Sequence, residues 1–483
     1  MLRPLIALLS FLLLPNCLTT GNDALIKDVR QAMLKSTRYF HGEVATQGGY
    51  LYEYSADLKT RRGEGAASET EIWVQPPGTP TVGMAFLAAY EATGDQLFLD
   101  AAKDAAYALI HGQLQSGGWT ASIDFDPAGK RVDRYRNGKG RSKGKNYSTL
   151  DDDKTQAALC FLIKIDKLLG FKDASINESV QIALDALLKA QFPNGGFPQG
   201  WKAPVTKQPI IAASFPDYDW RTENRIKDYW DYYTLNDGLA GTVVRALIAA
   251  YETYGDDRYR QAMIRFGDFL LLAQLPQPQP AWAQQYNFDM HPMWARKFEP
   301  PAVSGAESVD VIHTLLTIYE ATGDAKYFAA TAPALQWLKR STLPDGQIAR
   351  FYELQTNRPL YFVRDSYELT YDDSNPPTHY SFKSRPGIDK IENRIAQIKE
   401  SGKTKPSTSS LKTLAADAQK LIAQLDPAGR WLEGQDGRPL TSKAPAAVRQ
   451  AIISSATFSK NLTRLAQYVQ AAERAEAAAE SGR

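Results

Sequence analysis

Two shortages limit what this protein can be: cysteine is rare, and no long apolar segment follows the N-terminus. Of the 483 residues only Cys17 and Cys160 are cysteines. Cys17 lies at the end of an expected leader, so the mature chain would keep one cysteine, which excludes an internal disulfide and requires a large core. Cys160 lies in an apolar helical pattern and is interpreted as a core thiol.

An excess of charge of either sign is also missing. The 56 Lys and Arg residues nearly balance the 54 Asp and Glu residues, and the formal net charge is +2. Such a chain has no general attraction for nucleic acid or membrane surfaces, so any basic site must be local. The five histidines show no metal-ligand spacing, and the sequence has no glycine-rich phosphate loop and no Ser-His-Asp arrangement.

Residues 1–21 predict a signal peptide. Arg3 is followed by an apolar run over residues 5–14, which Pro15 interrupts. This run suits a secretory signal and is too short to span a bilayer, although a buried N-terminal helix is an alternative. We therefore expect a secreted or periplasmic protein without a membrane span. Lipid attachment at Cys17 is not favoured, because Pro15 lies where small residues are usual.

From residue 79 onward, pairs of apolar helical stripes recur four times. A stop glycine separates the two stripes of each pair, at Gly94, Gly170, Gly255 and Gly323, at intervals of about 70–85 residues. Repeated helix pairs that bury a shared core predict an all-α fold, either a solenoid or an α/α toroid. The long loops favour the toroid, an incomplete α/α barrel of helical hairpins, because they would gather on one face and form a cleft there.

The expected domains are the signal peptide, a toroid over residues 22–389, and a helical C-terminal appendage over residues 390–483. The last boundary follows Pro386, beyond which a polar segment separates two helical patterns. We expect this chain to be a monomer.

Carboxylates gather where two helix pairs start. Asp151, Asp152 and Asp153 precede the second pair, and Asp237 precedes the third. One aspartate can cap a helix and favour its dipole, but three together repel one another, and a hard cation such as calcium would relieve that repulsion. In a toroid, successive pair starts face one mouth, so Asp151 and Asp237 are expected to converge. Two such carboxylates suit a calcium site or a glycosidase acid and base.

Arginines lie among aromatic residues further on. Arg350, Arg358 and Arg364 fall in a stretch without helical period, where they either grip an anionic ligand or tie two packed layers together. Arg296 lies between aromatic residues, where it either recognises a carboxylate or pairs with Glu299. Arginines and two acidic starts together predict an anion-binding site, with calcium as the candidate cation.

These residues resemble polysaccharide lyase family 10, the pectate lyases built on an α/α toroid. The resemblance runs over residues 147–365 and rests on eight stretches in order, together with Thr155 and Glu299: Thr149-Leu150-Asp151, Asn194-Gly195-Gly196-Phe197-Pro198-Gln199, Thr234-Leu235-Asn236-Asp237, Trp282-Ala283-Gln284, Trp294-Ala295-Arg296, Ala349-Arg350-Phe351-Tyr352, Thr356-Asn357-Arg358-Pro359 and Arg364-Asp365. It implies calcium-dependent β-elimination on polygalacturonate.

The resemblance also implies roles for single residues. Arg364 matches the family's arginine base, which removes the C5 proton of a uronate. Asp151 and Asp237 match aspartates near calcium, and Arg350 and Arg296 match arginines that bind substrate carboxylates. An arginine base would need burial among other cations, because a guanidinium is normally protonated.

Two more residues are expected to contact substrate, Asp152 and Arg358, the latter with a structural tie as its alternative role. Where the family usually has Asn-Gly-Ala-Thr after its first aspartate, this chain has Asp152-Asp153-Lys154-Thr155. This departure could alter cation affinity or substrate.

Two other functions fit the same residues. A toroidal glycoside hydrolase acting on a uronate-containing polysaccharide would use Asp151 and Asp237 as its two carboxylates. A non-catalytic carbohydrate-binding relative would bind the polymer without turnover. The lyase hypothesis is preferred because arginines flank the two acidic starts.

Overall fold

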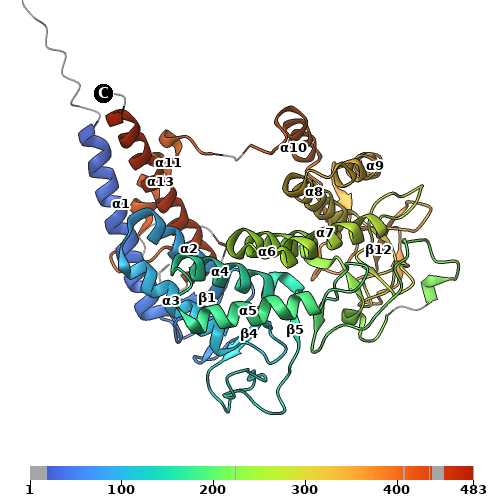
Figure 1. Ribbon diagram of the computed structural model, residues 1–483, viewed down its shortest axis with the longest axis horizontal. Coiled ribbons are helices and arrows are strands. Elements are labelled where there is room, and N and C mark those ends of the chain that lie inside the picture. Colours follow the sequence, from blue (N-terminus) through green and yellow to red (C-terminus); the bar gives the residue numbers. More distant parts are fainter. Residues whose placement is uncertain (1–18, 223–224, 406–407, 435, 438–450, 482–483) are drawn as a thin grey trace, which may run out of the picture.

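Paired helices dominate the computed structural model, which describes residues 19–222, 225–405, 408–434, 436–437 and 451–481 (Figure 1). The helices are α1 (Thr19–Tyr39), α2 (Thr79–Thr93), α3 (Gln96–His111), α4 (Lys154–Leu168), α5 (Ala174–Lys189), α6 (Leu239–Tyr254), α7 (Asp257–Leu272), α8 (Gly305–Thr322), α9 (Ala325–Ser341), α10 (Ile388–Ser401), α11 (Leu411–Gln424) and α13 (Ser455–Ser481). None of the helices in this described part is long and apolar enough to cross a membrane.

The turn inside each helix pair follows from a glycine stop and an acidic start. Gly94, Gly255 and Gly323 end α2, α6 and α8 with φ of 69°, 68° and 74°, the left-handed backbone that glycine adopts most readily. In these three pairs the next helix begins two residues after the glycine, and in the α4–α5 pair it begins four residues after Gly170, whose φ is 63°. The four helix pairs expected from the sequence are therefore present, α2–α3, α4–α5, α6–α7 and α8–α9.

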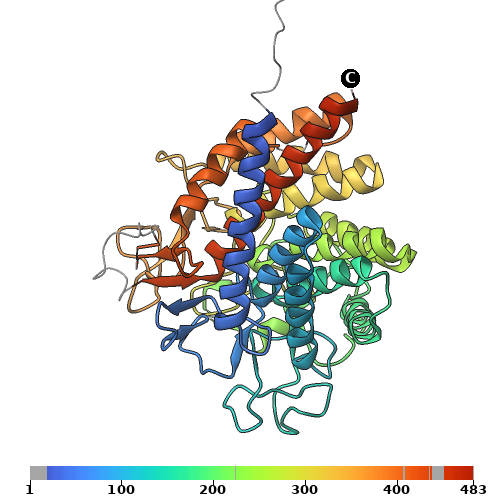
Figure 2. The same ribbon diagram turned by 90° about the vertical axis from the view of Figure 1, so that its left-hand side faces the viewer.

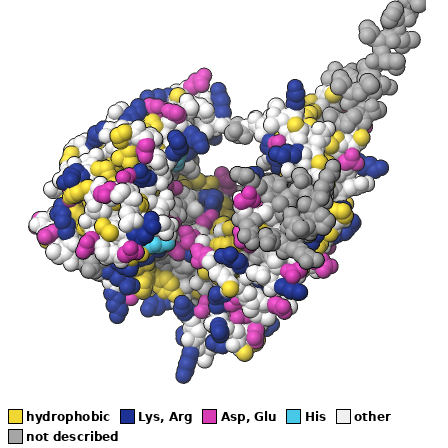
Figure 3. All heavy atoms as spheres, turned by 180° about the vertical axis from the view of Figure 1, so that it is seen from behind, with side chains coloured by type: hydrophobic (Ala, Val, Ile, Leu, Met, Phe, Trp, Pro, Cys, Tyr) yellow, Lys and Arg dark blue, Asp and Glu magenta, His cyan; other side chains and the backbone are white. Residues whose placement is uncertain are grey.

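The pairs stand side by side in an arc with an inner and an outer row. The inner row runs α13, α2, α4, α6, α8 and α10, each packed on the next, while α1, α3, α5, α7 and α9 lie outside. Figure 1 shows the arc open between α10 and the end that holds α1 and α13. From behind, the molecule is hollowed between these two ends, with acidic and basic side chains around the hollow (Figure 3). The predicted all-α incomplete toroid is confirmed.

Short antiparallel strands pair with one another beside each of the four helix pairs. The strand before an inner helix pairs with a strand after its outer helix, in β3–β4, β5–β6, β7–β8 and β9–β11. Because this arrangement repeats, the inner helices all start on one face. The paired strands are β3 (Glu71–Trp73), β4 (Ser122–Asp124), β5 (Ser148–Thr149), β6 (Gly200–Trp201), β7 (Tyr233–Thr234), β8 (Gln285–Tyr286), β9 (Val303–Ser304) and β11 (Phe351–Tyr352).

Further short strands lie in the segment between α9 and α10. β11 also pairs with β12, which pairs with β13, and β10 pairs with β14. Their bounds are β10 (Ile348–Ala349), β12 (Pro359–Phe362), β13 (Leu369–Thr370) and β14 (Lys383–Ser384).

The two ends of the chain meet in one further unit. β16 (Ile452–Ser454) lies between β15 (Leu432–Glu433) and β1 (Glu53–Ser55), which also pairs with β2 (Arg61–Arg62). α13 packs along α2 and beside α1 (Figure 2). The division of the chain at residue 389 stays a prediction, and within the expected C-terminal appendage α13 packs against α2 in the inner row. The predicted signal peptide lies mostly outside the described residues.

Candidate functional site

The inner helices α4 and α6 start from two turns of the same shape. Each follows a short strand and consists of one 3-10 turn, Asp151–Asp153 before α4 and Asn236–Gly238 before α6. Asp152 and Asp237 occupy equivalent places with φ of 48° and 53°. Left-handed backbone at a non-glycine residue costs about 1–3 kcal/mol and is often found at functional sites. Neither turn supplies a side-chain cap to its helix, so these carboxylates are not used for capping.

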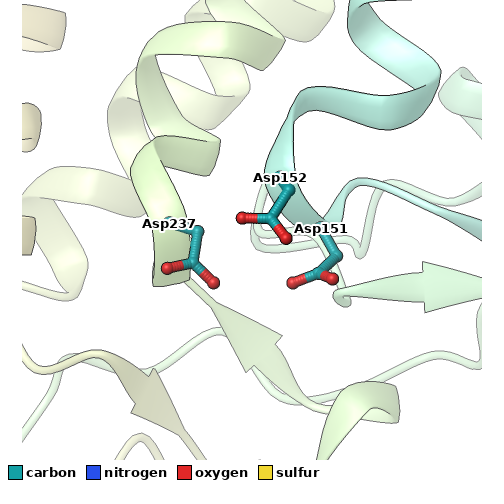
Figure 4. Close-up of side chains that lie close together, drawn as sticks. All are labelled: Asp151, Asp152 and Asp237. Atoms are coloured by element: carbon teal, nitrogen blue, oxygen red, sulfur yellow. The ribbon is translucent and has the colours of Figure 1, made fainter. Parts of the chain in front are cut away.

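The structure brings three carboxylates together across the gap between the two turns. Figure 4 shows Asp151 and Asp152 facing Asp237 from the start of the neighbouring helix. One oxygen of each lies within 4.8 Å of the others. Three carboxylate oxygens at this spacing fit a hard cation such as calcium, which takes six to eight oxygen ligands, so substrate and water would supply the rest.

Polar side chains hold the first two carboxylates in place. Gln199 Nε2 donates to Asp151 Oδ1 at 2.6 Å, and Gln75 Nε2 donates to Asp152 Oδ2 at 3.2 Å. Lys154 Nζ lies 2.7 Å from Asp151 Oδ2 and 3.3 Å from Asp152 Oδ2. Burial and the charge of Asp151 raise the pKa of Asp152.

Arg350 reaches the third carboxylate from the strand region. Its Nη2 lies 3.5 Å from Asp237 Oδ1 and 2.9 Å from Oε1 of Glu307, a buried residue of α8. It also donates to Asn236 Oδ1 at 3.2 Å. Burial and the negative charges of Glu307 and Asp152 raise the pKa of Asp237 to about 7, against the opposing effect of Arg350. Asp237 therefore takes up a proton easily when no cation is bound.

Tyr380 joins Arg350 to Arg296. The two guanidinium groups lie 4.4 Å and 5.4 Å from the centre of the Tyr380 ring. The Tyr380 hydroxyl donates to Glu299 Oε1 at 2.9 Å, and Arg296 Nε donates to Glu299 Oε2 at 2.7 Å. Arg296 thus pairs with Glu299, as one interpretation of the sequence expected, and its binding of a substrate carboxylate stays a prediction.

Arg364 and Arg358 are not brought to the carboxylates. Arg364 is exposed in the turn between β12 and β13, where its Nε donates to the Pro376 carbonyl at 3.1 Å. Arg358 is also exposed, and its guanidinium lies 3.4 Å from the centre of the Tyr371 ring. Within the described part of the chain neither has a contact with the acidic cluster. The stacking of Arg358 matches its alternative role as a structural tie.

Sequence reasoning missed Glu307 and Tyr380. Glu307 lies two residues beyond the start of α8, the inner helix of the fourth pair, where a search for acidic pair starts could have found it. Tyr380 lies in a loop without helical or strand period, and its place between Arg296 and Arg350 depends on contacts far apart in sequence. No local sequence pattern indicates the role of Tyr380.

One protein-family description matches more than half of the chain. The model for pectic acid lyase matches residues 113–378, which include the three carboxylates, Arg296, Arg350 and Arg364. No curated protein sequence matches the chain.

Solved structures offer weaker similarities. A family 10 polysaccharide lyase from Cellvibrio cellulosa is 22% identical with a TM-score of 0.45, over 67% of this chain and 97% of that chain. An aspartate mutant of a family 10 lyase from the same organism, in complex with trigalacturonic acid, is 21% identical with a TM-score of 0.46, over 67% and 98%. Cellobiose 2-epimerase from Spirochaeta thermophila is 13% identical with a TM-score of 0.44, over 94% and 99%. All three scores lie below 0.5.

Proposed function

The chain belongs to the pectic acid lyase family and is a polysaccharide lyase, and from this premise we propose that it cleaves polygalacturonate by calcium-assisted β-elimination. One observation carries the proposal: Asp151, Asp152 and Asp237 approach within 4.8 Å from two helix starts, with Arg350 against Asp237. This arrangement offers oxygen ligands to a cation and, beside them, a guanidinium to a uronate carboxylate.

The elimination needs positive charge beside the uronate. In β-elimination the C5 proton leaves to a base, its electron pair forms the C4–C5 double bond, and the C4–O bond breaks so that the leaving oxygen takes a proton. The C5 proton becomes removable when charge developing on the adjacent carboxylate is stabilised. A bound calcium ion would supply part of that stabilisation. Arg350 and Arg296 would supply the rest and orient the sugar.

Asp152 is proposed as a third cation ligand rather than as a contact to substrate alone. It is equivalent in backbone position to Asp237, and its carboxylate belongs to the same cluster. The proposed ligands are therefore Asp151, Asp152 and Asp237.

Two arginines are candidates for the base that accepts the C5 proton. Arg364 is the residue that family resemblance indicates, but its exposed turn would have to approach the cleft in the complex with substrate. Arg296 is the second candidate by position, because it lies against the same Tyr380 ring as Arg350. Despite burial, its pair with Glu299 raises the pKa of the guanidinium, so that pair would have to break before Arg296 could act as a base. A proton acceptor must come within hydrogen-bond reach of the proton that it removes.

Chemical rescue distinguishes the two candidates. We would measure elimination by Arg364→Ala and Arg296→Ala in increasing guanidine at low, non-denaturing concentration. The variant that lacks the base should lose about 10³-fold in kcat and regain activity with added guanidine. A variant that lost only a binding contact should show a raised KM and no rescue.

A hydrolase with two catalytic carboxylates fits the geometry less well. Such pairs lie about 5–5.5 Å apart in retaining enzymes and about 6.5–9.5 Å apart in inverting ones. Here the carboxylate oxygens approach within 4.8 Å, and Lys154 contacts two of the three groups. The third carboxylate favours a shared cation, because a glycosidase acid and its partner need only two carboxylates.

The ultraviolet absorbance of unsaturated uronate products tests the proposal. With polygalacturonate the wild type should produce this absorbance, and excess chelator should reduce it. New reducing ends without absorbance would instead identify hydrolysis, and binding without any product would identify a non-catalytic relative.

The proposal also includes export of the enzyme from the cytoplasm. The apolar run over residues 5–14 supports a cleaved signal peptide and a secreted or periplasmic enzyme, where polymeric pectin is met. N-terminal sequencing of the exported protein checks the cleavage.

A further inference from the structure

Lys154 places a positive charge inside the proposed cation site. It is the first residue of α4, only 5% exposed, and its ammonium lies 2.7 Å and 3.3 Å from the carboxylates of Asp151 and Asp152. At the equivalent place in the second turn, α6 begins with Leu239, which is buried and apolar. The two turns therefore share a backbone shape but differ in charge at three positions, where Asp151, Asp153 and Lys154 correspond to Asn236, Gly238 and Leu239.

The ammonium uses oxygens that a cation would need. Lys154 contacts Oδ2 of both Asp151 and Asp152, and Asp151 Oδ1 already accepts from Gln199. Asp237, on the other side of the cluster, has no contact with Lys154 and faces Arg350 instead. Lys154 thus holds two of the three proposed ligands in ion pairs.

Displacing this ammonium is unfavourable because it is buried. A buried ammonium without a partner loses its hydration, so a cation that takes both oxygens must displace Lys154 from them toward another partner or solvent. The cost of this displacement weakens cation binding. The same charge remains in the site when no cation is present, where it offsets part of the repulsion among the carboxylates.

We propose that Lys154 is a built-in competitor for the divalent cation and sets the affinity of this site for calcium. The inference rests on the proposed function for the identity of the cation. With Lys154 present, the site should bind calcium more weakly, and release it more readily, than three carboxylates alone would.

Calcium titration of matched lysine variants tests this assignment. We would titrate wild type, Lys154→Met and Lys164→Met with calcium chloride by isothermal calorimetry, after circular dichroism has established that each is folded. Lys164 lies on the same helix and pairs with Glu91 at 2.9 Å, away from the cluster. Lys154→Met should bind calcium at least tenfold more tightly than wild type, about 1.4 kcal/mol, and Lys164→Met should match wild type.

The outcomes separate this inference from the proposed function. Equal or weaker calcium affinity in folded Lys154→Met overturns the inference, even if the enzyme is a lyase. Absence of calcium binding in every variant overturns it as well. Tighter binding in Lys154→Met supports it even where no elimination product is found, which would count against the proposed function alone.

A measurement on the wild type keeps the test open if Lys154→Met does not fold. Displacement by calcium should expose the amine, so amine-specific labelling of Lys154, followed by mass spectrometry, should rise several-fold at saturating calcium. Labelling of Lys164 should not change. Unchanged or reduced labelling of Lys154 would overturn the competition.

Discussion

Aspartates stand at the starts of both the outer and the inner helices, and they do different work there. At the outer starts Asp95, Asp173, Asp256 and Asp324 each accept a backbone N–H two residues on, at 2.9–3.1 Å. At the inner starts of α4 and α6, Asp152 and Asp237 sit in left-handed turns and cap nothing. The same residue type caps a helix in one row and belongs to a cluster of three carboxylates in the other.

The difference lies in what precedes each helix. An outer helix follows its partner after a short turn, so its aspartate has extended backbone and reaches its own N–H groups. The inner helices α4 and α6 follow a strand through a tight left-handed turn, which directs the carboxylate toward the neighbouring inner helix. These inner starts forgo capping, worth about 1 kcal/mol, and accept strained backbone, a loss of stability that is common at functional sites.

The largest expected effect is on activity at an inner start. Asp237→Asn should lower kcat/KM for elimination by about 10³-fold or more, because it removes one proposed cation ligand and the partner of Arg350. Asp95→Asn at an outer start is the matched control and should leave kcat/KM unchanged. Initial rates on polygalacturonate measure both. Similar losses in the two variants would remove the distinction between the rows.

Removing Arg350 should have the next largest effect, on stability. Arg350→Met leaves the buried Glu307 carboxylate without its guanidinium partner, and breaking a buried pair typically costs about 3–5 kcal/mol. Urea unfolding monitored by circular dichroism measures this loss. Arg358→Met, which removes an exposed stacking contact, should cost less than about 1 kcal/mol.

The pH dependence of stability should show the raised pKa of Asp237. Its pKa is about 7 in the folded protein and near 3.8 when unfolded, so the carboxyl stabilises the fold when protonated, and this contribution is lost as pH rises through 7. In chelator, Asp237→Asn should therefore raise the free energy of unfolding by about 2–4 kcal/mol at about pH 8 and change it little at about pH 4. An equal change at both pH values would contradict the raised pKa.

The smallest expected effect is at an outer cap. Asp95→Ala removes the acceptor of the Leu97 N–H at 3.0 Å and should cost about 1 kcal/mol of stability without a change in kcat/KM. Thermal unfolding and the elimination assay check the two halves of this prediction. A loss of activity in this folded variant would link the outer row to the site.

The repeated helices could be predicted because their signals are local. Apolar stripes and stop glycines such as Gly94 and Gly255 need only a few neighbours to form, and toroid geometry then brings Asp151 and Asp237 together. The positions of the arginine side chains were harder to predict. Arg350 and Arg364 are close in sequence, but the pairing of β11 with β12 leaves Arg364 in the exposed turn beyond β12.

The packing of the chain ends could not be predicted for the same reason. The pairing of β16 with β1 joins segments about 400 residues apart, at Glu53 and Ser454, and no local pattern records such a partner. Tyr380 illustrates the same limit within the site, since its place between Arg296 and Arg350 depends on contacts far apart in sequence.

Mass analysis of the products formed from polygalacturonate tests the central claim most directly. If the inner starts form a site for elimination, wild type should release oligouronates with an unsaturated end, lighter by one water than hydrolysis products, and Asp237→Asn should release almost none. Saturated oligouronates from the wild type, or equal unsaturated product from Asp237→Asn, would contradict the account.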